Sequence, residues 1–237
     1  MFRKKENSVE RPYCAAVIVA AGSGTRMGGD KLLLELGGCT VIERTMLALD
    51  RCECIDELVV VTQSEKIPAI AALARERGIR KLKCVVEGGA DRTQSAWKGV
   101  YECSDRAELI AIHDGARPLC TPEMIDEVVQ AAHRYGAAVP GVKPKDSLKT
   151  RQGGMVQEDV DRDSVVAVQT PQVFAFEEYD AALGYCLEQH RSCTDDAGVY
   201  AVLQKPVYIV EGDYRNIKVT TPEDVAIAEM FLKGESL

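Results

Sequence analysis

The sequence of 237 residues contains no apolar run long enough to cross a bilayer, and no apolar signal-peptide region follows its polar start. It also lacks a basic excess, because its formal net charge is −8, whereas a general nucleic-acid binder normally carries a basic face. Hydrophobic residues make up 46%, which is ordinary for a soluble domain and enough for one continuous core. We therefore expect a cytoplasmic protein with neither a membrane nor a nucleic acid as partner.

Cysteine pairs with zinc-site spacing are also missing. Nine cysteines are scattered along the chain, and the closest pair, Cys52 and Cys54, has no second pair to complete a metal site. Cys14 and Cys84 lie inside apolar runs, so free thiols in a reducing cytosol explain the pattern. No Ser-His-Asp or Cys-His set stands out either. Covalent catalysis therefore has no obvious nucleophile, which favours direct displacement.

Short β-branched runs alternate with longer amphipathic segments from residue 14 to about residue 140. Strands are predicted at residues 15–20, 58–62, 82–86 and 109–113. Helices are predicted at residues 41–50, 67–77, 92–102 and 122–135. Thr121 before Pro122 is typical of an N-cap followed by proline at the first helical position. The alternation predicts an α/β fold, a mostly parallel twisted sheet flanked by helices.

The alternation stops in residues 140–160, which contain two prolines, a Gly-Gly pair and many charges. We predict an extended β-arm that protrudes and packs on a second subunit, with a mobile surface loop as the alternative. The polar residues 1–12 are predicted to be a disordered N-terminus, and residues 13–237 a single domain. Further elements are predicted beyond the arm: a strand at 167–169, helices from 177 and near 196–203, a strand at 207–210 and a last helix from 222.

A glycine-rich loop follows the first predicted strand, with the sequence AAGSGTRMG from Ala20 to Gly28. Glycines there let backbone N–H groups approach a phosphate closely. The spacing is neither that of a dinucleotide fingerprint nor that of a P-loop. Two cations, Arg26 and Lys31, suit a triphosphate that is attacked at its α-phosphorus. Alternatively, both lie on a solvated surface turn.

Other polar loops follow the later strands, and in a parallel sheet ligands bind beyond the carboxyl ends of the strands. Gly88–Ser95 combines glycines with an arginine, and His113–Pro118 contains an aspartate and an arginine. Asp114 can hold Mg²⁺ or a substrate hydroxyl, and Arg117 a phosphate. Structural alternatives are that Asp114 caps a turn, that His113 is a packed strand-end histidine, and that Thr194-Asp195-Asp196 caps a helix.

Six motifs in this order resemble the 2-C-methyl-D-erythritol 4-phosphate cytidylyltransferase family of the non-mevalonate isoprenoid pathway, over residues 14–233. They are AAGSGTRMGGDK, GGADRTQS, IHDGARP, VQTPQVF, TDD and NIKVTTPEDVAIAE. The resemblance implies a Rossmann-like nucleotidyltransferase fold and a homodimer joined through an extended β-arm. It also implies CTP and a polyol phosphate as substrates, with Mg²⁺ as cofactor.

The resemblance also implies roles for individual residues. Arg26 and Lys31 would stabilise the transition state at the α-phosphate, and Arg162, from the partner's arm, and Lys218 would position the acceptor phosphate. The nucleotide would be surrounded or read by Ala20, Ala21, Gly22, Gly24, Gly89 and Ser95. The acceptor would be contacted by Asp114, Arg117 and Thr170, and by Ser147, which stands where the arm normally has a threonine.

Three other functions compete with this interpretation. A ribitol-5-phosphate cytidylyltransferase shares the glycine loop and the Thr-Pro-Gln segment, although Gly115-Ala116 favours the methylerythritol enzyme. A module that senses CTP without turning it over would need no second set of phosphate cations, whereas this sequence has Arg162 and Lys218. An NAD-dependent oxidoreductase is disfavoured by the glycine spacing.

Overall fold

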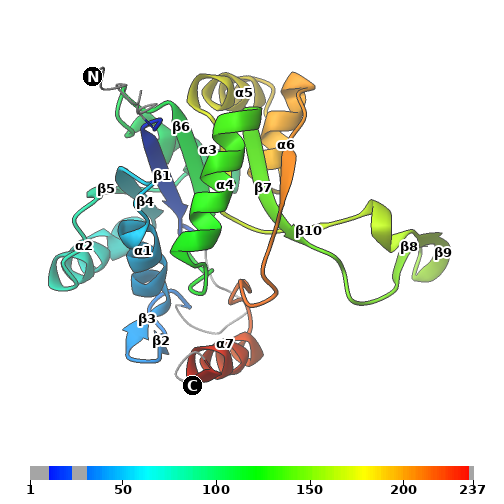
Figure 1. The fold of residues 1–237 in the computed structure, drawn as a ribbon, viewed down its shortest axis with the longest axis horizontal. Coiled ribbons are helices and arrows are strands. Elements are labelled where there is room, and N and C mark those ends of the chain that lie inside the picture. Colours follow the sequence, from blue (N-terminus) through cyan, green and yellow to red (C-terminus); the bar gives the residue numbers. More distant parts are fainter. Residues whose placement is uncertain (1–10, 23–30, 235–237) are drawn as a thin grey trace, which may run out of the picture.

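The computed structural model describes residues 11–22 and 31–234. At their centre lies an eight-stranded sheet with strand order β10-β7-β11-β6-β1-β4-β5, in which β12 also pairs with β7 (Figure 1). Its strands are β1 (Cys14–Val19), β4 (Glu57–Thr62), β5 (Leu82–Glu87), β6 (Leu109–Asp114), β7 (Ala137–Val142), β10 (Ala167–Val168), β11 (Gln172–Ala175) and β12 (Tyr208–Glu211). A separate small ribbon is formed by β2 (Glu35–Leu36) and β3 (Cys39–Thr40).

The part of the sheet built first in the sequence is parallel. Strand β1 pairs in parallel with β4 and β6, and β4 with β5, so these strands end at one common edge. Strand β12 is parallel to β7, whereas β11 runs antiparallel to both β6 and β7, and β10 antiparallel to β7. The prediction of a mostly parallel sheet is confirmed.

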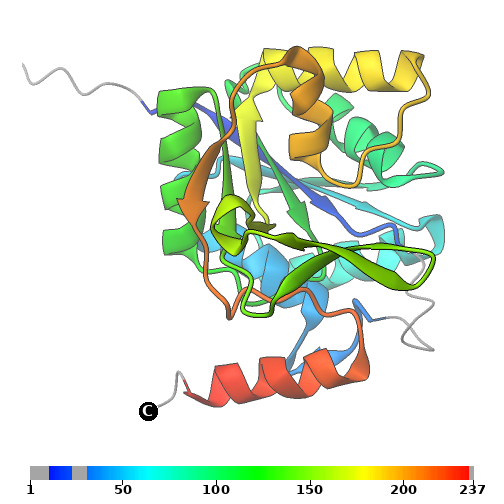
Figure 2. The same cartoon turned by 90° about the vertical axis from the view of Figure 1, so that its right-hand side faces the viewer.

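Helices cover both faces of the sheet (Figures 1 and 2). They are α1 (Val41–Arg51), α2 (Ile67–Glu76), α3 (Arg92–Tyr101), α4 (Pro122–Tyr135), α5 (Phe176–Glu188), α6 (Asp196–Tyr200) and α7 (Pro222–Gly234), with 3₁₀ turns η2 (Ser64–Lys66), η3 (Arg162–Ser164) and η4 (Ala201–Leu203). The predicted capping of α4 is confirmed, because the Thr121 side chain accepts a hydrogen bond from the Met124 amide.

The alternation of side chains along β1 divides the core into two layers. Cys14, Ala16 and Ile18 pack in a cluster with residues of α1, α2 and α4. Ala15 and Val17 face the opposite way, into a cluster with residues of α3, α5 and α6. Buried on both faces, the central strands read as continuous apolar runs, and this is why they could be predicted from the sequence.

The predicted arm is a hairpin of β8 (Leu148–Gln152) and β9 (Met155–Val160), which projects from the body (Figure 1). Gly153 and Gly154 form its turn with φ values of 56° and 85°, a conformation that glycine adopts easily. The predicted start at residue 140 is wrong, because β7 continues to Val142. Pro140 lacks an N–H, but its carbonyl accepts from the Gln169 amide at 2.7 Å and holds it in the sheet.

The two ends of the described chain pack against the body. The guanidinium of Arg11 binds the Asp56 carboxylate at 2.7 Å and Pro12 is buried, so the prediction of disorder is wrong for these two residues. Residues 1–10 of the predicted disordered N-terminus lie outside the described residues. At the other end, Ala228 of α7 joins Leu36 and Val219 in a small cluster. None of the helices in the described ranges has the length and apolar character to cross a membrane.

Candidate active site

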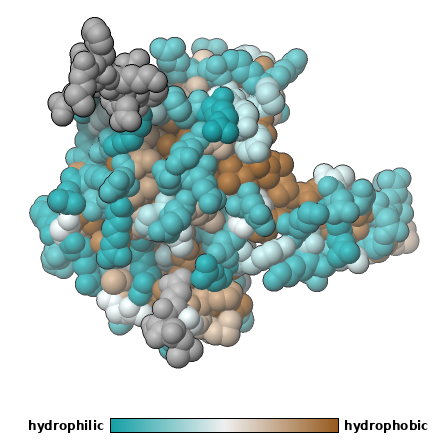
Figure 3. Space-filling view, viewed as in Figure 1, coloured by the Kyte–Doolittle hydropathy of each residue, from teal (hydrophilic) through white to brown (hydrophobic). Residues whose placement is uncertain are grey.

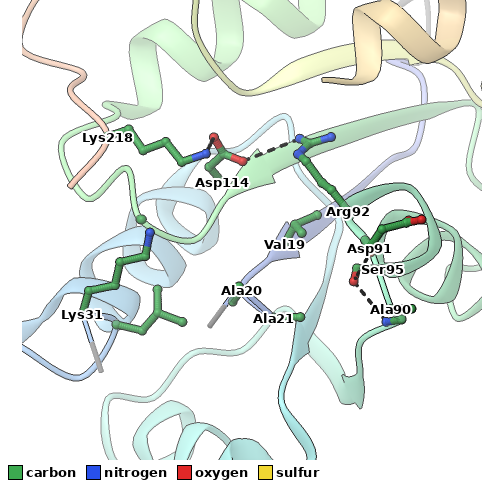
Figure 4. Close-up of a pocket in the computed structure, with 14 residues that line it drawn as sticks. Val19, Ala20, Ala21, Lys31, Ala90, Asp91, Arg92, Ser95, Asp114 and Lys218 are labelled. Atoms are coloured by element: carbon green, nitrogen blue, oxygen red, sulfur yellow. Dashed lines mark hydrogen bonds and ion pairs between the residues drawn. The ribbon is translucent and has the colours of Figure 1, made fainter. Parts of the chain in front are cut away.

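A cavity of about 430 Å³ lies beyond the carboxyl ends of β1, β5 and β6 (Figure 4). Its size lies in the range of about 300–1,000 Å³ that is typical of small-molecule sites. Its lining consists of Val19, Ala20, Ala21, Gly22, Lys31, Leu32, Gly89, Ala90, Asp91, Arg92, Ser95, Asp114, Ala116 and Lys218. The structure thus brings together eight of the predicted site residues: Ala20, Ala21, Gly22, Lys31, Gly89, Ser95, Asp114 and Lys218. The predictions for Gly24 and Arg26 lie outside the described residues.

One wall of the cavity is the loop between β5 and α3. The Ser95 hydroxyl accepts from the Gly89 amide at 3.0 Å and donates to the Asp91 carbonyl at 2.8 Å. Asp91 in turn caps α3 by accepting from the Gln94 amide at 2.8 Å. Because the one hydroxyl proton of Ser95 is used inside the loop, this side chain shapes the wall rather than offering a donor to a ligand.

The first glycine loop touches this wall closely. A Cβ added at Gly88 would lie 2.4 Å from the Cβ of Ala21, a separation that real Cβ atoms do not show. The absence of a side chain at position 88 therefore lets the two backbone loops approach each other. Such an approach is what a groove that binds a nucleotide through backbone groups requires.

The opposite wall carries a buried carboxylate among cations. The Lys218 ammonium lies 2.9 Å from Asp114 Oδ2, Arg117 Nε lies 3.6 Å from the same oxygen, and Arg92 Nη2 lies 3.6 Å from Oδ1. Burial works to raise the pKa of Asp114, but the charges of Lys218 and Arg92 outweigh it and hold the pKa at about 2. Asp114 is therefore an ionised acceptor group in the cavity at neutral pH.

These surroundings count against Asp114 as a metal ligand. Three cationic groups within 3.6 Å already compensate its charge, and a divalent cation would have to compete with them. Among the residues that the structure describes, no group of three or more His, Cys, Asp or Glu side chains is placed to hold a metal ion. The residues present do not fit a protein-held Mg²⁺ at this position.

Thr170 and His113 lie behind Asp114 and do not line the cavity. Thr170 Oγ1 accepts from the Asp114 amide at 3.1 Å and lies 3.0 Å from His113 Nδ1. Burial lowers the pKa of His113 to about 4, so the ring is neutral at physiological pH. The interpretation of His113 as a packed strand-end histidine is confirmed. Thr170 is placed to hold the Asp114 backbone rather than to meet a ligand directly.

Arg117 and Asn216 brace the same corner. Besides Asp114, the Arg117 guanidinium contacts the Asn216 carbonyl, to which Nη1 donates at 2.7 Å. The buried Asn216 side chain donates to the Thr170 carbonyl at 3.0 Å. The chain segment that carries Lys218 is thereby tied to the turn after β6. Arg117 does not line the cavity, but it contacts Asp114, which does.

The two predicted site residues of the arm are remote from this cavity. Ser147 is exposed, and Arg162 lies in η3, where its Nη1 donates to the Lys145 carbonyl at 3.1 Å. Neither side chain lines the cavity of its own chain.

Sequence reasoning assigned no role to Arg92, which lines the cavity as the first residue of α3. The sequence feature that points to Arg92 as a site residue is its position directly after a glycine loop that follows a strand. The prediction that Thr194-Asp195-Asp196 forms a helix cap with acidic residues in the first turn is confirmed, but it does not foresee the partner of Asp196. The Asp195 side chain is the cap of α6, accepting from the Gly198 amide at 2.9 Å, whereas Asp196 is fully buried and paired with Arg92.

Glycine loops, cations and an ionised carboxylate at the ends of parallel strands define an α/β protein that handles phosphorylated ligands. The sequence profile of a family described as 2-C-methyl-D-erythritol 4-phosphate cytidylyltransferase matches residues 14–234. A relative of that name from Geobacillus kaustophilus is 41% identical over 227 residues, covering 92% of this chain and 96% of its own. Another from Pelotomaculum thermopropionicum is 38% identical over 224 residues, covering 93% and 94%.

Solved structures agree with these relatives. 4-Diphosphocytidyl-2C-methyl-D-erythritol synthase from Anaerococcus prevotii superposes with a TM-score of 0.84 at 30% identity, covering 94% of this chain and all of that one. The 2-C-methyl-D-erythritol 4-phosphate cytidylyltransferase of Thermus thermophilus gives a TM-score of 0.76 at 30% identity, covering 92% and 98%. The chain belongs to the 2-C-methyl-D-erythritol 4-phosphate cytidylyltransferase family.

Proposed function

We propose that this protein transfers CMP from CTP to 2-C-methyl-D-erythritol 4-phosphate, giving 4-diphosphocytidyl-2-C-methyl-D-erythritol and pyrophosphate. The reaction is a step of isoprene biosynthesis by the non-mevalonate pathway. The observation that carries the proposal is the convergence of Lys31, Asp114 and Lys218 on one cavity whose other wall is built from glycine loops. Family membership supplies the identity of the nucleotide and of the acceptor.

The reaction needs no nucleophile from the protein. An oxygen of the acceptor phosphate attacks the α-phosphorus in line, and the bond from that phosphorus to the bridging oxygen of the β-phosphate breaks. Pyrophosphate leaves with the electron pair of that bond. Lys31, which lines the cavity, stabilises the added negative charge, and Lys218 orients the attacking phosphate. We assign Arg26 the same task as Lys31.

The walls of the cavity divide between the two substrates. Ala20, Ala21 and Gly22 surround the triphosphate and ribose, and the loop shaped by Gly89 and Ser95 receives cytosine. We assign Gly24, outside the described residues, to the triphosphate as well. Asp114 accepts hydrogen bonds from the acceptor's hydroxyl groups, since its carboxylate stays ionised. Arg117 and Thr170 act on the acceptor through Asp114, because both contact it from behind.

Mg²⁺ remains part of the proposal as a companion of the triphosphate. When bound, it would supply additional neutralisation of phosphate charge. The described residues do not form a carboxylate site for it, so no step above depends on a protein-held metal ion.

We also propose a homodimer joined through the arm, in which Ser147 and Arg162 complete the partner's site. Support comes from two large apolar side chains near the tip of the hairpin, Met155 and Val156, which are 67% and 68% exposed. In addition, Figure 3 shows hydrophobic atoms gathered where the arm leaves the body. An arm without a core of its own gains stability when a second subunit covers such surface.

A cytoplasmic location is proposed from the thiols. All nine cysteines are free, although Cys52 and Cys54 place their sulfur atoms only 3.0 Å apart. A reducing compartment keeps such thiols unpaired.

The alternative functions, a ribitol-5-phosphate cytidylyltransferase and a CTP-sensing module, are disfavoured because the relatives are named 2-C-methyl-D-erythritol 4-phosphate cytidylyltransferases. The nucleotide half of the proposal is tested by measuring pyrophosphate release from CTP, UTP and ATP in the presence of methylerythritol phosphate. Release with CTP well above that with ATP is expected. Binding of CTP without any release would instead support the sensing module.

A further inference from the structure

Arg92 lines the cavity and faces Asp114 across it (Figure 4), and its guanidinium also pairs with a second carboxylate, Asp196, which is not part of the lining. Its Nη1 and Nη2 donate to Asp196 Oδ1 and Oδ2 at 2.9 and 2.6 Å, a bidentate pair. The same Nη2 lies 3.6 Å from Oδ1 of Asp114. One planar guanidinium thus links a carboxylate that faces the cavity to one that does not.

The second carboxylate, that of Asp196, lies in a buried polar site that receives the Arg92 guanidinium. Asp196 is fully buried, and its Oδ1 also accepts from the hydroxyl of Tyr179 at 2.7 Å, whose side chain is equally buried. A buried carboxylate is costly unless it is paired and hydrogen-bonded, and here Arg92 and Tyr179 meet both needs. Although burial works to lower the pKa of Arg92, the charge and hydrogen bonds of Asp196 raise it, so the guanidinium keeps its charge.

The arrangement gives the two oxygens of Asp114 separate neighbours. Oδ1 faces Arg92, whereas Oδ2 faces Lys218 and Arg117. A carboxylate flanked by cations on both sides cannot rotate freely without losing one of them. Arg92 therefore fixes the plane in which Asp114 presents its lone pairs to the cavity.

We propose that Arg92 is a positioning residue that orients the Asp114 carboxylate for the hydroxyl groups of the acceptor, and that Asp196 and Tyr179 hold Arg92 in place for this task. The inference rests on the proposed function and adds three residues to it. Arg92 also begins the helix whose first turn contains Ser95. The loop that receives the nucleotide and the carboxylate that receives the acceptor are thus tied to one helix end.

Steady-state kinetics of the full-length enzyme test this proposal with three variants. Asp196→Asn keeps the shape of the side chain but removes its charge, Tyr179→Phe removes one hydrogen bond, and Arg92→Met removes the link itself. Each should raise the KM for methylerythritol phosphate, by about tenfold for Asp196→Asn and Arg92→Met. The KM for CTP should stay within about twofold of wild type, because the loop contacts of Ser95 are untouched.

Two further variants separate positioning from general stability. Arg92→Lys keeps the charge but cannot bridge two carboxylates, so its acceptor KM should fall between those of wild type and Arg92→Met. Arg77→Met is the control for losing an arginine–carboxylate pair elsewhere, since Arg77 binds Glu43 at 2.7 Å outside the cavity. This control should lower Tm without changing either KM.

The outcomes are distinct. An active wild type whose acceptor KM is unchanged in Asp196→Asn and Tyr179→Phe, while Tm falls, would show a purely structural ion pair and overturn the inference alone. If Asp196→Asn does not fold, an unchanged acceptor KM in Tyr179→Phe and Arg92→Lys would overturn it equally. A wild type that makes no product from CTP and methylerythritol phosphate would overturn the proposed function itself, and the inference with it.

Discussion

Lys218 and Asp114 form an ion pair across the wall of the cavity, with Nζ 2.9 Å from Oδ2. The lysine comes from the segment between β12 and α7, and the aspartate is the last residue of β6. Asn216 and Arg117 tie these two segments together through a hydrogen bond at 2.7 Å. The pair is therefore held by the fold, and it places side by side a cation that suits a phosphate and a carboxylate that suits hydroxyl groups.

Replacing Lys218 should impair use of the acceptor. Lys218→Met removes the cation that we assign to the acceptor phosphate, so kcat/KM for methylerythritol phosphate should fall by about 100-fold or more. Binding of CTP, measured by calorimetry, should change little. A Lys205→Ala variant, which removes a surface cation paired with Glu178, serves as the control and should keep wild-type kinetics. Weakened CTP binding with unchanged acceptor use would assign Lys218 to the nucleotide instead.

Lys31→Ala should lower kcat far more than it lowers nucleotide affinity. Lys31 lines the cavity beside the first glycine loop, and its charge is needed most when negative charge builds up at the α-phosphorus. We expect a loss of about 10² to 10³ in kcat with a CTP KM within about threefold of wild type. Single-turnover kinetics give the rate of the chemical step directly. An unchanged rate would remove Lys31 from catalysis.

Mixed dimers test whether the arm completes the partner's site. Arg162→Ala and Lys31→Ala subunits should each be nearly inactive as homodimers. If Arg162 acts across the interface, each mixed dimer has one intact site, so random mixing should restore about one quarter of wild-type activity. Activity that stays at the level of the single variants after subunit exchange would show that each site is built from one chain.

Two helical glycines should respond oppositely to alanine. A Cβ at Gly99 of α3 would lie 2.4 Å from Val17 Cγ1 and 2.7 Å from Val61 Cγ2, so Gly99→Ala should lower the free energy of unfolding by about 1–3 kcal/mol. A Cβ at Gly184 of α5 meets no atom within 4 Å, so Gly184→Ala should raise it by up to about 1 kcal/mol. Urea denaturation measures both, and equal effects would contradict the close packing of α3 on β1.

His113 should make stability depend on pH. Burial lowers its folded-state pKa to about 4, below the ordinary 6.5, so the unfolded chain binds the proton more readily. The contribution of neutral His113 to the free energy of unfolding is complete above pH 6.5 and is lost as the pH falls towards 4. The free energy of unfolding should fall by about 2 kcal/mol between pH 7 and pH 5 from this group. His113→Asn should remove that part of the dependence, and equal slopes in both proteins would contradict it.

The sequence was sufficient for the features that depend on local pattern. The buried strands and the helices between them are predicted within about two residues, because apolar runs and 3.6-residue spacing reflect burial directly. The meeting of Gly89, Asp114 and Lys218 at one edge follows from the rule for parallel strands. The sequence alone therefore assigns these residues to one site.

Other features depend on contacts between distant segments. The pairing of Arg92 with Asp196 joins two helix ends, and no local pattern indicates it. Thr170 and Ser95 were predicted to meet ligands, whereas their hydroxyls are engaged within the protein, an outcome decided by burial. Pro140 and Gly141 stand at the start of the predicted arm but lie inside β7, because pairing on both sides of this strand outweighs their low strand propensity.

Acceptor specificity is the most direct test of the proposed activity. Purified protein is given CTP and Mg²⁺ with either methylerythritol 4-phosphate or ribitol 5-phosphate, and pyrophosphate release is followed while the cytidylated product is identified by mass. Release with methylerythritol 4-phosphate, and little or none with ribitol 5-phosphate, is the predicted result. Release with ribitol 5-phosphate alone would contradict it.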